Sequence, residues 1–124
     1  MTHRVLVIED QEDNRRILRD MLGSAGIEVL EARDGVTGVA TALRERPDLI
    51  LMDIQMPRMD GYEATRRIKS SAEGRDIPII AVTSYALSGD EALARQAGCD
   101  DYVTKPFSPR LLLELVRQRL PKDD

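Results

Sequence analysis

Short runs of apolar residues alternate along this chain with stretches in which apolar residues recur every three or four positions. Continuous apolar runs are typical of strands buried on both faces, and the longer period is typical of amphipathic helices. The pattern predicts strands at residues 4–8, 28–32, 48–52, 79–82 and 101–103. Because strands and helices alternate from end to end, we expect an α/β fold, a doubly wound parallel sheet with helices on both faces.

The intervening helices have recognisable ends. The first two are expected at residues 11–22, before Gly23, and at residues 35–46, before Pro47. The third helix is expected to begin near Asp60. The fourth is expected to span residues 88–97, before Gly98. The fifth is expected to open with Ser108 and Pro109. The spacing places these residues on inward faces: Ile17, Leu18, Met21, Leu22, Val36, Val39, Ala40, Leu43, Leu111, Leu112, Leu115, Val116 and Leu120.

Polar side chains follow four of the predicted strands. In chain order they are Glu9 and Asp10, then Asp53, then Thr83 and Ser84, and finally Lys105. Right-handed crossovers place the carboxyl ends of parallel strands at one edge of a sheet, which is where ligands bind in such folds. We therefore expect these groups to converge, although the pattern does not show the order of the strands.

Such a cluster of acids needs positive charge. Three carboxylates within about 5 Å of one another repel by about 3 kcal/mol per pair at an effective dielectric constant of about 20. Lys105 alone cannot neutralise three acids, so a divalent cation is expected. Oxygen ligands favour Mg²⁺ over Zn²⁺, which usually recruits histidine or cysteine, and His3 and Cys99 lie elsewhere in the chain.

With that cation, Asp53 could attack a phosphoryl group and form an acyl phosphate. Lys105 and the Thr83 hydroxyl would then contact its oxygens. The alternative is that Glu9 and Asp10 merely cap the first helix, which is the favoured interpretation for one acidic strand end taken alone. Polar groups at several matched strand ends favour a site instead.

Composition limits the other possibilities. The 124 residues fit one domain, and a net charge of −4 with a pI near 5.1 argues against direct nucleic-acid binding through a basic face. We see no apolar run long enough to cross a membrane and no signal peptide, so a cytoplasmic protein is expected. The lone Cys99 agrees with a reducing compartment and is expected to pack in a tight loop.

The whole chain resembles the receiver domain of bacterial two-component response regulators. The most specific segments are Val7-Ile8-Glu9-Asp10, residues 51–61 around Asp53, Ala81-Val82-Thr83-Ser84 and residues 102–107 around Lys105. The resemblance implies a flavodoxin-like (βα)5 fold with a five-stranded sheet of order 2-1-3-4-5. It also implies that residues 1–124 form the receiver and that no output domain follows.

Residue by residue, the resemblance makes Asp53 the phosphoacceptor. It implies that Mg²⁺ is held by Glu9, Asp10, Asp53 and the backbone carbonyl of Gln55. Thr83, Ser84 and Lys105 would contact the phosphoryl group.

The resemblance also assigns regulatory positions. Tyr102 would act with Thr83 as a switch, and Gln55 and Tyr85 would tune the lifetime of the acyl phosphate. The bond between Lys105 and Pro106 is expected to be a cis peptide.

The implied partners are a sensor histidine kinase or a histidine phosphotransfer protein, and a downstream protein that contacts residues 88–120. The chain resembles single-domain regulators of motility or the cell cycle, and also receivers attached to hybrid kinases. It would be a signalling protein that catalyses its own phosphorylation and dephosphorylation, as a monomer or a phosphorylation-dependent homodimer. It could instead pass its phosphoryl group onward in a phosphorelay.

Three other interpretations remain open. A haloacid dehalogenase-type phosphatase would place an Asp-x-Asp nucleophile after the first strand, where this chain has Asp10-Gln11-Glu12. A flavodoxin-like electron carrier needs a hydroxyl-rich phosphate loop there, and acids would repel phosphate. A receiver-like scaffold that is never phosphorylated is the third.

Overall fold

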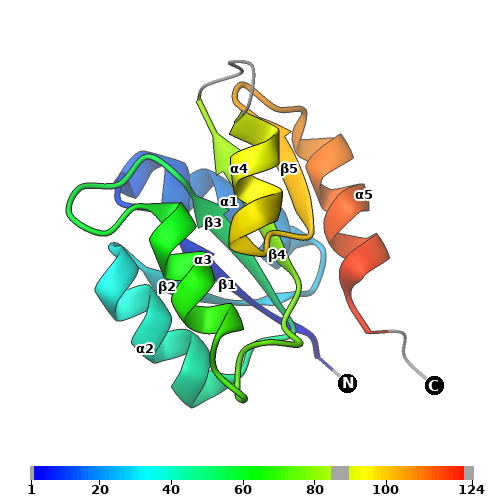
Figure 1. The fold of residues 1–124 in the computed structure, drawn as a ribbon. Coiled ribbons are helices and arrows are strands. Elements are labelled where there is room, and N and C mark those ends of the chain that lie inside the picture. Colours follow the sequence, from blue (N-terminus) through cyan, green and yellow to red (C-terminus); the bar gives the residue numbers. More distant parts are fainter. Residues whose placement is uncertain (1, 85–89, 122–124) are drawn as a thin grey trace.

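The computed structural model describes residues 2–84 and 90–121, and there five strands alternate with five helices (Figure 1). The strands are β1 (Arg4–Ile8), β2 (Glu28–Ala32), β3 (Leu49–Asp53), β4 (Ile79–Thr83) and β5 (Asp101–Thr104). The helices are α1 (Glu12–Ser24), α2 (Gly35–Glu45), α3 (Gly61–Lys69), α4 (Asp90–Ala97) and α5 (Pro109–Arg119). All neighbouring strands are parallel in the order β2-β1-β3-β4-β5, which confirms the expected fold.

The sheet lies between two helical layers (Figure 1). Helices α2, α3 and α4 cover the face toward the viewer, and α1 and α5 cover the other. Successive side chains of a strand point to opposite faces. Accordingly, Leu6 and Ile8 of β1 pack in the cluster under α2, α3 and α4, whereas Val5 and Val7 pack in the cluster under α1 and α5. This two-sided burial explains why the three central strands β1, β3 and β4 are almost continuously apolar, whereas the edge strands β2 and β5 also carry acidic residues.

Helix α1 is longer than predicted, and the prediction that Gly23 ends it was wrong. Gly23 lies inside the helix, which continues to Ser24. The residue in the left-handed conformation is Gly26, with φ of +79°. A glycine ends a helix only where the backbone turns left-handed, so the second of two nearby glycines has this role.

Helix α2 packs through small residues, which contradicts the predicted inward face. Its buried positions are Gly35, Gly38, Thr41 and Ala42, whereas Val39 and Leu43 are only half-buried. Val36 and Ala40, both predicted to be buried, are exposed. A Cβ atom on Gly38 would lie 2.6 Å from Ile8 Cδ1, so the close approach of α2 to the sheet depends on this glycine.

Two further apolar residues were wrongly placed inward. Ile17 on α1 and Leu111 on α5 are 52% and 58% exposed. In each helix the buried residues are four positions apart, Leu18 and Leu22 in α1 and Leu112 and Val116 in α5. An adjacent residue is rotated by about 100° around the helix axis, which takes it off this narrow buried stripe.

Helix starts were predicted more accurately. The Asp60 carboxylate accepts a hydrogen bond from the Glu63 N–H at 3.0 Å, and Ser108 caps α5 ahead of Pro109. Gly98, with φ of +112°, follows α4 as expected. The predicted start of α4 at residues 88–89 lies outside the described residues. None of the helices described here is long and apolar enough to cross a membrane.

Candidate functional site

The carboxyl ends of the strands bring three acids together. Glu9 follows β1 directly, and Asp53 is the last residue of β3, which pairs with β1. Their side chains are 2% and 5% exposed, and one oxygen from each of Glu9, Asp10 and Asp53 lies within 4.8 Å of the others. The sequence prediction that these acids converge is therefore confirmed.

The negative charge of this cluster is offset by the Lys105 ammonium group and by a proton on Asp53. Lys105 Nζ lies 2.9 Å from Glu9 Oε1 and 3.7 Å from Asp53 Oδ1. Burial, together with the hydrogen bond and negative charge of Glu9, raises the pKa of Asp53 to about 8. Burial also tends to raise the pKa of Glu9, but hydrogen bonds to Asp53, Lys105 and the Gln11 N–H hold it below its ordinary value. Near neutral pH the cluster thus keeps a proton on Asp53.

Asp10 supplies the observation that bears on a metal. Its Oδ1 atom is buried and has no hydrogen-bond partner among residues 2–84 and 90–121. A buried acceptor without a partner is costly, and a hard cation would satisfy it. Burial, with the Glu9 carboxylate beside it, raises the pKa of Asp10. Three carboxylates, one of which has a buried oxygen without a hydrogen-bond partner among the residues that the structure describes, fit the donor set of Mg²⁺.

Helix capping does not explain these acids. The residue that caps α1 is Gln11, whose side chain makes no capping hydrogen bond. Glu9 Oε2 accepts a hydrogen bond from the Gln11 N–H at 3.1 Å, but Gln11 precedes the first residue of α1, so this N–H is not one of the helix donors that a cap satisfies. The alternative that Glu9 and Asp10 merely cap the first helix is therefore not what the structure shows.

The end of β4 lies next to Asp53 because β3 and β4 are neighbours. The Gln55 side chain spans these strand ends: its Nε2 donates to the Thr83 hydroxyl, and its Oε1 accepts from the Ser84 N–H at 2.8 Å. The Gln55 N–H itself donates to Asp53 Oδ1 at 3.3 Å. The predicted hydroxyl and amide groups are thus at the site, but both are bonded to Gln55.

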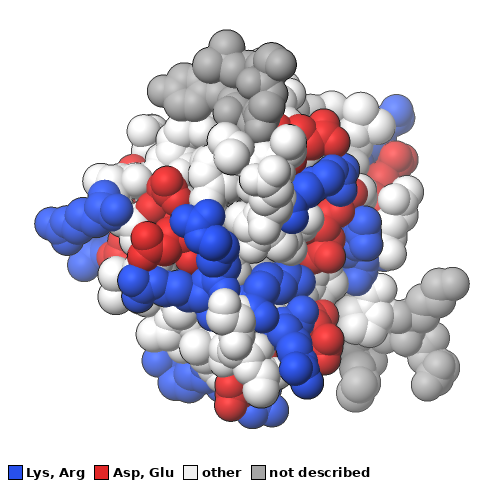
Figure 2. Space-filling view, in the orientation of Figure 1, with Lys and Arg blue, Asp and Glu red and all other residues white. Residues whose placement is uncertain are grey.

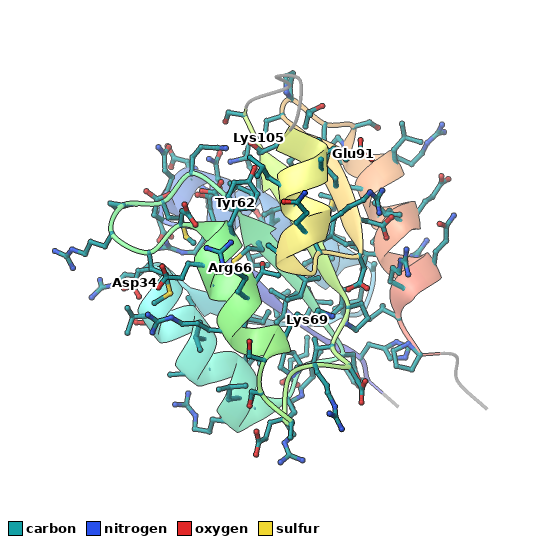
Figure 3. All side chains as sticks on the ribbon, viewed as in Figure 1. Asp34, Tyr62, Arg66, Lys69, Glu91 and Lys105 are labelled. Carbon is teal, nitrogen blue, oxygen red and sulfur yellow. The ribbon has the colours of Figure 1, made fainter. Side chains whose placement is uncertain are left out.

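Among the remaining predicted positions, Lys105, Pro106 and Tyr102 are described by the structure. Lys105 lies near the upper end of the molecule in Figure 3, and its peptide bond with Pro106 is cis. Tyr102 on β5 is half-buried and packs against the cluster under α2, α3 and α4. Tyr85, expected to tune the lifetime of an acyl phosphate, lies outside the described residues.

Arg15 is a residue whose contribution the sequence did not reveal. In the sequence it stands with Arg16 and Arg19 among acidic residues, a pattern typical of a solvated helix face. Its side chain is only 13% exposed, and its Nη1 donates to the Glu9 carbonyl oxygen at 2.9 Å while its Nε lies 3.4 Å from Glu31. Arg15 therefore fixes the backbone that carries the acids, through contacts that depend on tertiary structure.

An apolar groove of about 550 Å³ adjoins the acids, and it was also not predicted. Its walls come from the first turns of α1 and from the segment between β5 and α5. The residues that line it are Glu9, Asn14, Ile17, Leu18, Ser84, Lys105, Pro106, Phe107 and Pro109. The exposed Ile17 therefore borders a groove that is continuous with the acidic site.

Basic side chains gather over α3 on the face shown in Figure 2, with acids among them. Arg67 Nη2 lies 2.7 Å from Glu63 Oε2, and Lys69 Nζ lies 3.1 Å from Asp100 Oδ2. These pairs interrupt the positive charge that a nucleic-acid surface requires. The expectation that the protein binds no nucleic acid directly stays a prediction.

Comparison with known proteins identifies the family. Residues 5–117 match the family model of the response regulator receiver domain. The chain belongs to this family. It is 42% identical over 120 residues to the polar-differentiation response regulator DivK of Brucella ovis, covering 97% of this chain and 98% of the relative. The membership decides against a phosphatase of the haloacid dehalogenase type and against an electron carrier.

Solved receiver structures match the fold closely. The receiver domain of the sensor histidine kinase PA1611 from Pseudomonas aeruginosa is 41% identical, with a TM-score of 0.88 over 95% of this chain and 97% of that one. That structure has a magnesium ion coordinated in its active-site cleft. The chemotaxis protein CheY4 of Vibrio cholerae is 28% identical, with a TM-score of 0.91 over 97% of this chain and 100% of that one. This protein is thus a receiver of a two-component response regulator system, with an acidic cluster compatible with Mg²⁺.

Proposed function

We propose that Asp53 accepts a phosphoryl group from the phosphohistidine of a sensor histidine kinase or a histidine phosphotransfer protein. The observation that carries this proposal is the cluster at one edge of the sheet in which buried Asp53 and Glu9 lie beside the partly exposed Asp10 and Lys105. A carboxyl group that is only 5% exposed, beside a lysine and two further acids, is costly to bury, and titratable groups in such settings are concentrated at functional sites.

In the reaction, an Asp53 carboxylate oxygen attacks phosphorus as the bond between phosphorus and the histidine nitrogen of the donor breaks. Mg²⁺, held by Glu9, Asp10, Asp53 and the Gln55 carbonyl, would favour the ionised form of Asp53 and offset the charge of the incoming group. Lys105 leaves Glu9 to pair with a phosphoryl oxygen. The Thr83 hydroxyl and the Ser84 N–H donate to the remaining oxygens.

The apolar groove is the surface on which the phosphodonor protein docks. Asp53 is buried, so a donor histidine reaches it only if the donor covers the rim of the site. Glu9, Ser84 and Lys105 line both the rim and the groove, and Ile17 offers an exposed apolar contact on α1. A helix of the donor with apolar residues beside its histidine fits this continuous surface.

Phosphorylation then changes the surface formed by α4, β5 and α5. Thr83 lies at the end of β4, and Tyr102 lies on the adjacent β5, so a shift of the Thr83 hydroxyl toward the phosphoryl group reaches Tyr102 through neighbouring strands. We expect the changed surface to bind a downstream protein, or the receiver to pass its phosphoryl group onward. The protein would act in the cytoplasm, as a monomer or a phosphorylation-dependent homodimer.

The test is intact mass after incubation with acetyl phosphate and Mg²⁺. We expect a gain of one phosphoryl group in the wild type, no gain in Asp53→Asn, and no gain with excess chelator. Asp20→Asn, on the exposed surface of α1, is the matched control and should behave as the wild type. A receiver-like scaffold would give no gain, and beryllofluoride with Mg²⁺ would leave the Tyr102 resonances unchanged.

A further inference from the structure

The Gln55 amide closes the site before any phosphoryl group arrives. Its carbonyl oxygen accepts from the Ser84 N–H at 2.8 Å, and its nitrogen donates to the Thr83 hydroxyl. The orientation of the amide is fixed, because Ser84 N–H is a donor and only the oxygen of Gln55 can accept from it. We call this pair of hydrogen bonds the Gln55 clasp.

We propose that the Gln55 clasp is an internal competitor of the phosphoryl group, so that Asp53 is phosphorylated only when the clasp opens. This inference rests on the proposed function, since the competing groups are those that would contact a phosphoryl group on Asp53. This competition differs from protection of the acyl phosphate against water, because it acts in the unphosphorylated protein, at the step in which Asp53 gains the phosphoryl group.

Competition at Ser84 follows from the number of donors. A backbone N–H carries one hydrogen, and here that hydrogen points at Gln55 Oε1. A phosphoryl oxygen can take this hydrogen bond only if Gln55 Oε1 leaves it. The Gln55 oxygen thus stands where a phosphoryl oxygen would accept, and it keeps the Ser84 N–H in position meanwhile.

At Thr83 the clasp opposes movement instead. The Gln55 nitrogen holds the Thr83 hydroxyl oxygen, and Thr83 is the last residue of β4. A shift of this hydroxyl toward Asp53 breaks or lengthens that bond. One side chain therefore couples acquisition of the phosphoryl group to the first step of the expected switch.

If only the open form accepts a phosphoryl group, the apparent affinity equals the intrinsic affinity multiplied by the fraction of molecules in which the clasp is open. Two neutral hydrogen bonds that are exchanged for others change an equilibrium by about three- to tenfold. Without the clasp we expect beryllofluoride, which gives a carboxylate the tetrahedral geometry of a phosphoryl group, to bind about three- to tenfold more tightly. Acetyl phosphate should phosphorylate Asp53 faster by a similar factor.

The experiment compares the wild type with Gln55→Met, which keeps the length of the side chain but removes both hydrogen bonds. Gln55→Ala is a second variant in case methionine perturbs folding, and melting temperatures establish that each is folded. Gln118→Met, at an exposed glutamine near the end of α5, is the matched control. Beryllofluoride affinity is measured by NMR titration with Mg²⁺, and phosphorylation by intact mass against time. Tighter binding and faster phosphorylation in the Gln55 variants alone support the proposal, and unchanged or weaker binding overturns it.

A second measurement examines the clasp with no phosphoryl group present. Exchange of the Ser84 amide hydrogen with solvent should become about three- to tenfold faster in Gln55→Met than in the wild type. Unchanged exchange overturns the clasp even if the protein is phosphorylated. If the wild type neither binds beryllofluoride nor gains a phosphoryl group, the proposed function fails, and the exchange rate of Ser84 alone then decides whether the clasp exists.

Discussion

Lys105 donates a hydrogen bond to Glu9 and lies farther from Asp53: its Nζ is 2.9 Å from Glu9 Oε1 and 3.7 Å from Asp53 Oδ1. Glu9 is 2% exposed, so Lys105 provides much of the compensation for a buried carboxylate. The lysine that is expected to meet the phosphoryl group thus has a structural role before that group arrives.

Replacing Lys105 with methionine should therefore destabilise the protein. Without the ammonium the Glu9 carboxylate stays buried, and we expect the free energy of unfolding to fall by about 1–3 kcal/mol. Arg67→Met is the control, because it removes an exposed pair with Glu63 on α3 and should cost less than about 0.5 kcal/mol. Urea unfolding with a chelator present measures both, and equal losses would contradict the role given to Lys105.

Asp10 gives a prediction about Mg²⁺. Its buried Oδ1 has no partner among residues 2–84 and 90–121, and one oxygen from each of Glu9, Asp10 and Asp53 lies within 4.8 Å of the others. At about ten times its dissociation constant, Mg²⁺ should stabilise the protein by about 1.4 kcal/mol, which raises the melting temperature by about 5 °C. Asp10→Asn should lose most of this increase. Asp13→Asn, an exposed acid in the first turn of α1, should keep it, and equal responses would argue against Asp10 as a ligand.

The pKa of Asp53 gives a prediction about pH. In the folded protein without metal this pKa is raised to about 8, from an ordinary value of 3.8. Between about pH 4 and pH 8 the folded state therefore holds a proton that the unfolded state lacks, so this carboxyl contributes less stability as pH rises. Asp53→Asn does not titrate at this position. Its stability relative to the wild type should increase from pH 5 to pH 8.5 and then level off.

Urea unfolding at several pH values with a chelator measures this difference. Asp20→Asn, in which an exposed carboxyl is removed, should show no comparable dependence. A difference between Asp53→Asn and the wild type that stays constant with pH would show that the Asp53 carboxyl is ionised throughout.

Strands could be predicted from the sequence better than helix faces. The bounds of β1 and β2 agree with the prediction, β4 and β5 each extend one residue further at the carboxyl end, and β3 is shifted by one residue at both ends. Continuous apolar runs mark a strand that is buried on both faces. The inward face of α2 could not be predicted from hydropathy, because close approach to Ile8 selects Gly35 and Gly38, which carry no apolar side chain.

Some features of the candidate site could be predicted from the sequence, and others could not. Glu9, Asp10 and Asp53 could be placed together because each lies at or just after the carboxyl end of a strand, and parallel strands end at one edge. The hydrogen bonds that join Gln55 to Thr83 and Ser84 depend on the pairing of β3 with β4. Thr83 is 28 positions and Ser84 is 29 positions from Gln55 in the sequence. The bond from Arg15 to the Glu9 carbonyl leaves no trace in spacing or composition either.

Ile17 tests the docking surface. It is exposed and lines the groove beside the acids. Ile17→Glu should lower the rate of phosphoryl transfer from a phosphorylated histidine phosphotransfer protein by about tenfold, since loss of one buried apolar contact at an interface costs about 1–2 kcal/mol. Phosphorylation by acetyl phosphate should not change, because this small donor needs no docking.

Val36→Glu is the control for Ile17, since Val36 is 63% exposed on α2, which covers the other face of the sheet. It should leave both reactions unchanged. If Ile17→Glu slowed phosphorylation by acetyl phosphate as much as transfer from the protein donor, the substitution would be damaging the site itself, and the groove would have no part in docking.

Two glycines should respond to alanine in opposite directions. A Cβ atom on Gly61, the first residue of α3, would lie 2.5 Å from the Asp53 carbonyl oxygen and 2.8 Å from Ile54 Cα. These are backbone atoms of the segment that carries the phosphoacceptor, so they cannot move without moving Asp53. We expect Gly61→Ala to lower the free energy of unfolding by about 1–3 kcal/mol.

Gly23 lies inside α1, and a Cβ atom there would have nothing within 4 Å. Alanine also restricts the unfolded chain more than glycine does, so Gly23→Ala should raise the free energy of unfolding by about 0.5–1 kcal/mol. Gly26→Ala has equal space but a φ of +79°, and it should be destabilising. Urea unfolding of the three variants distinguishes steric contact, helix propensity and left-handed backbone. If Gly23→Ala were destabilising as well, the helix would end at Gly23, as the sequence had suggested.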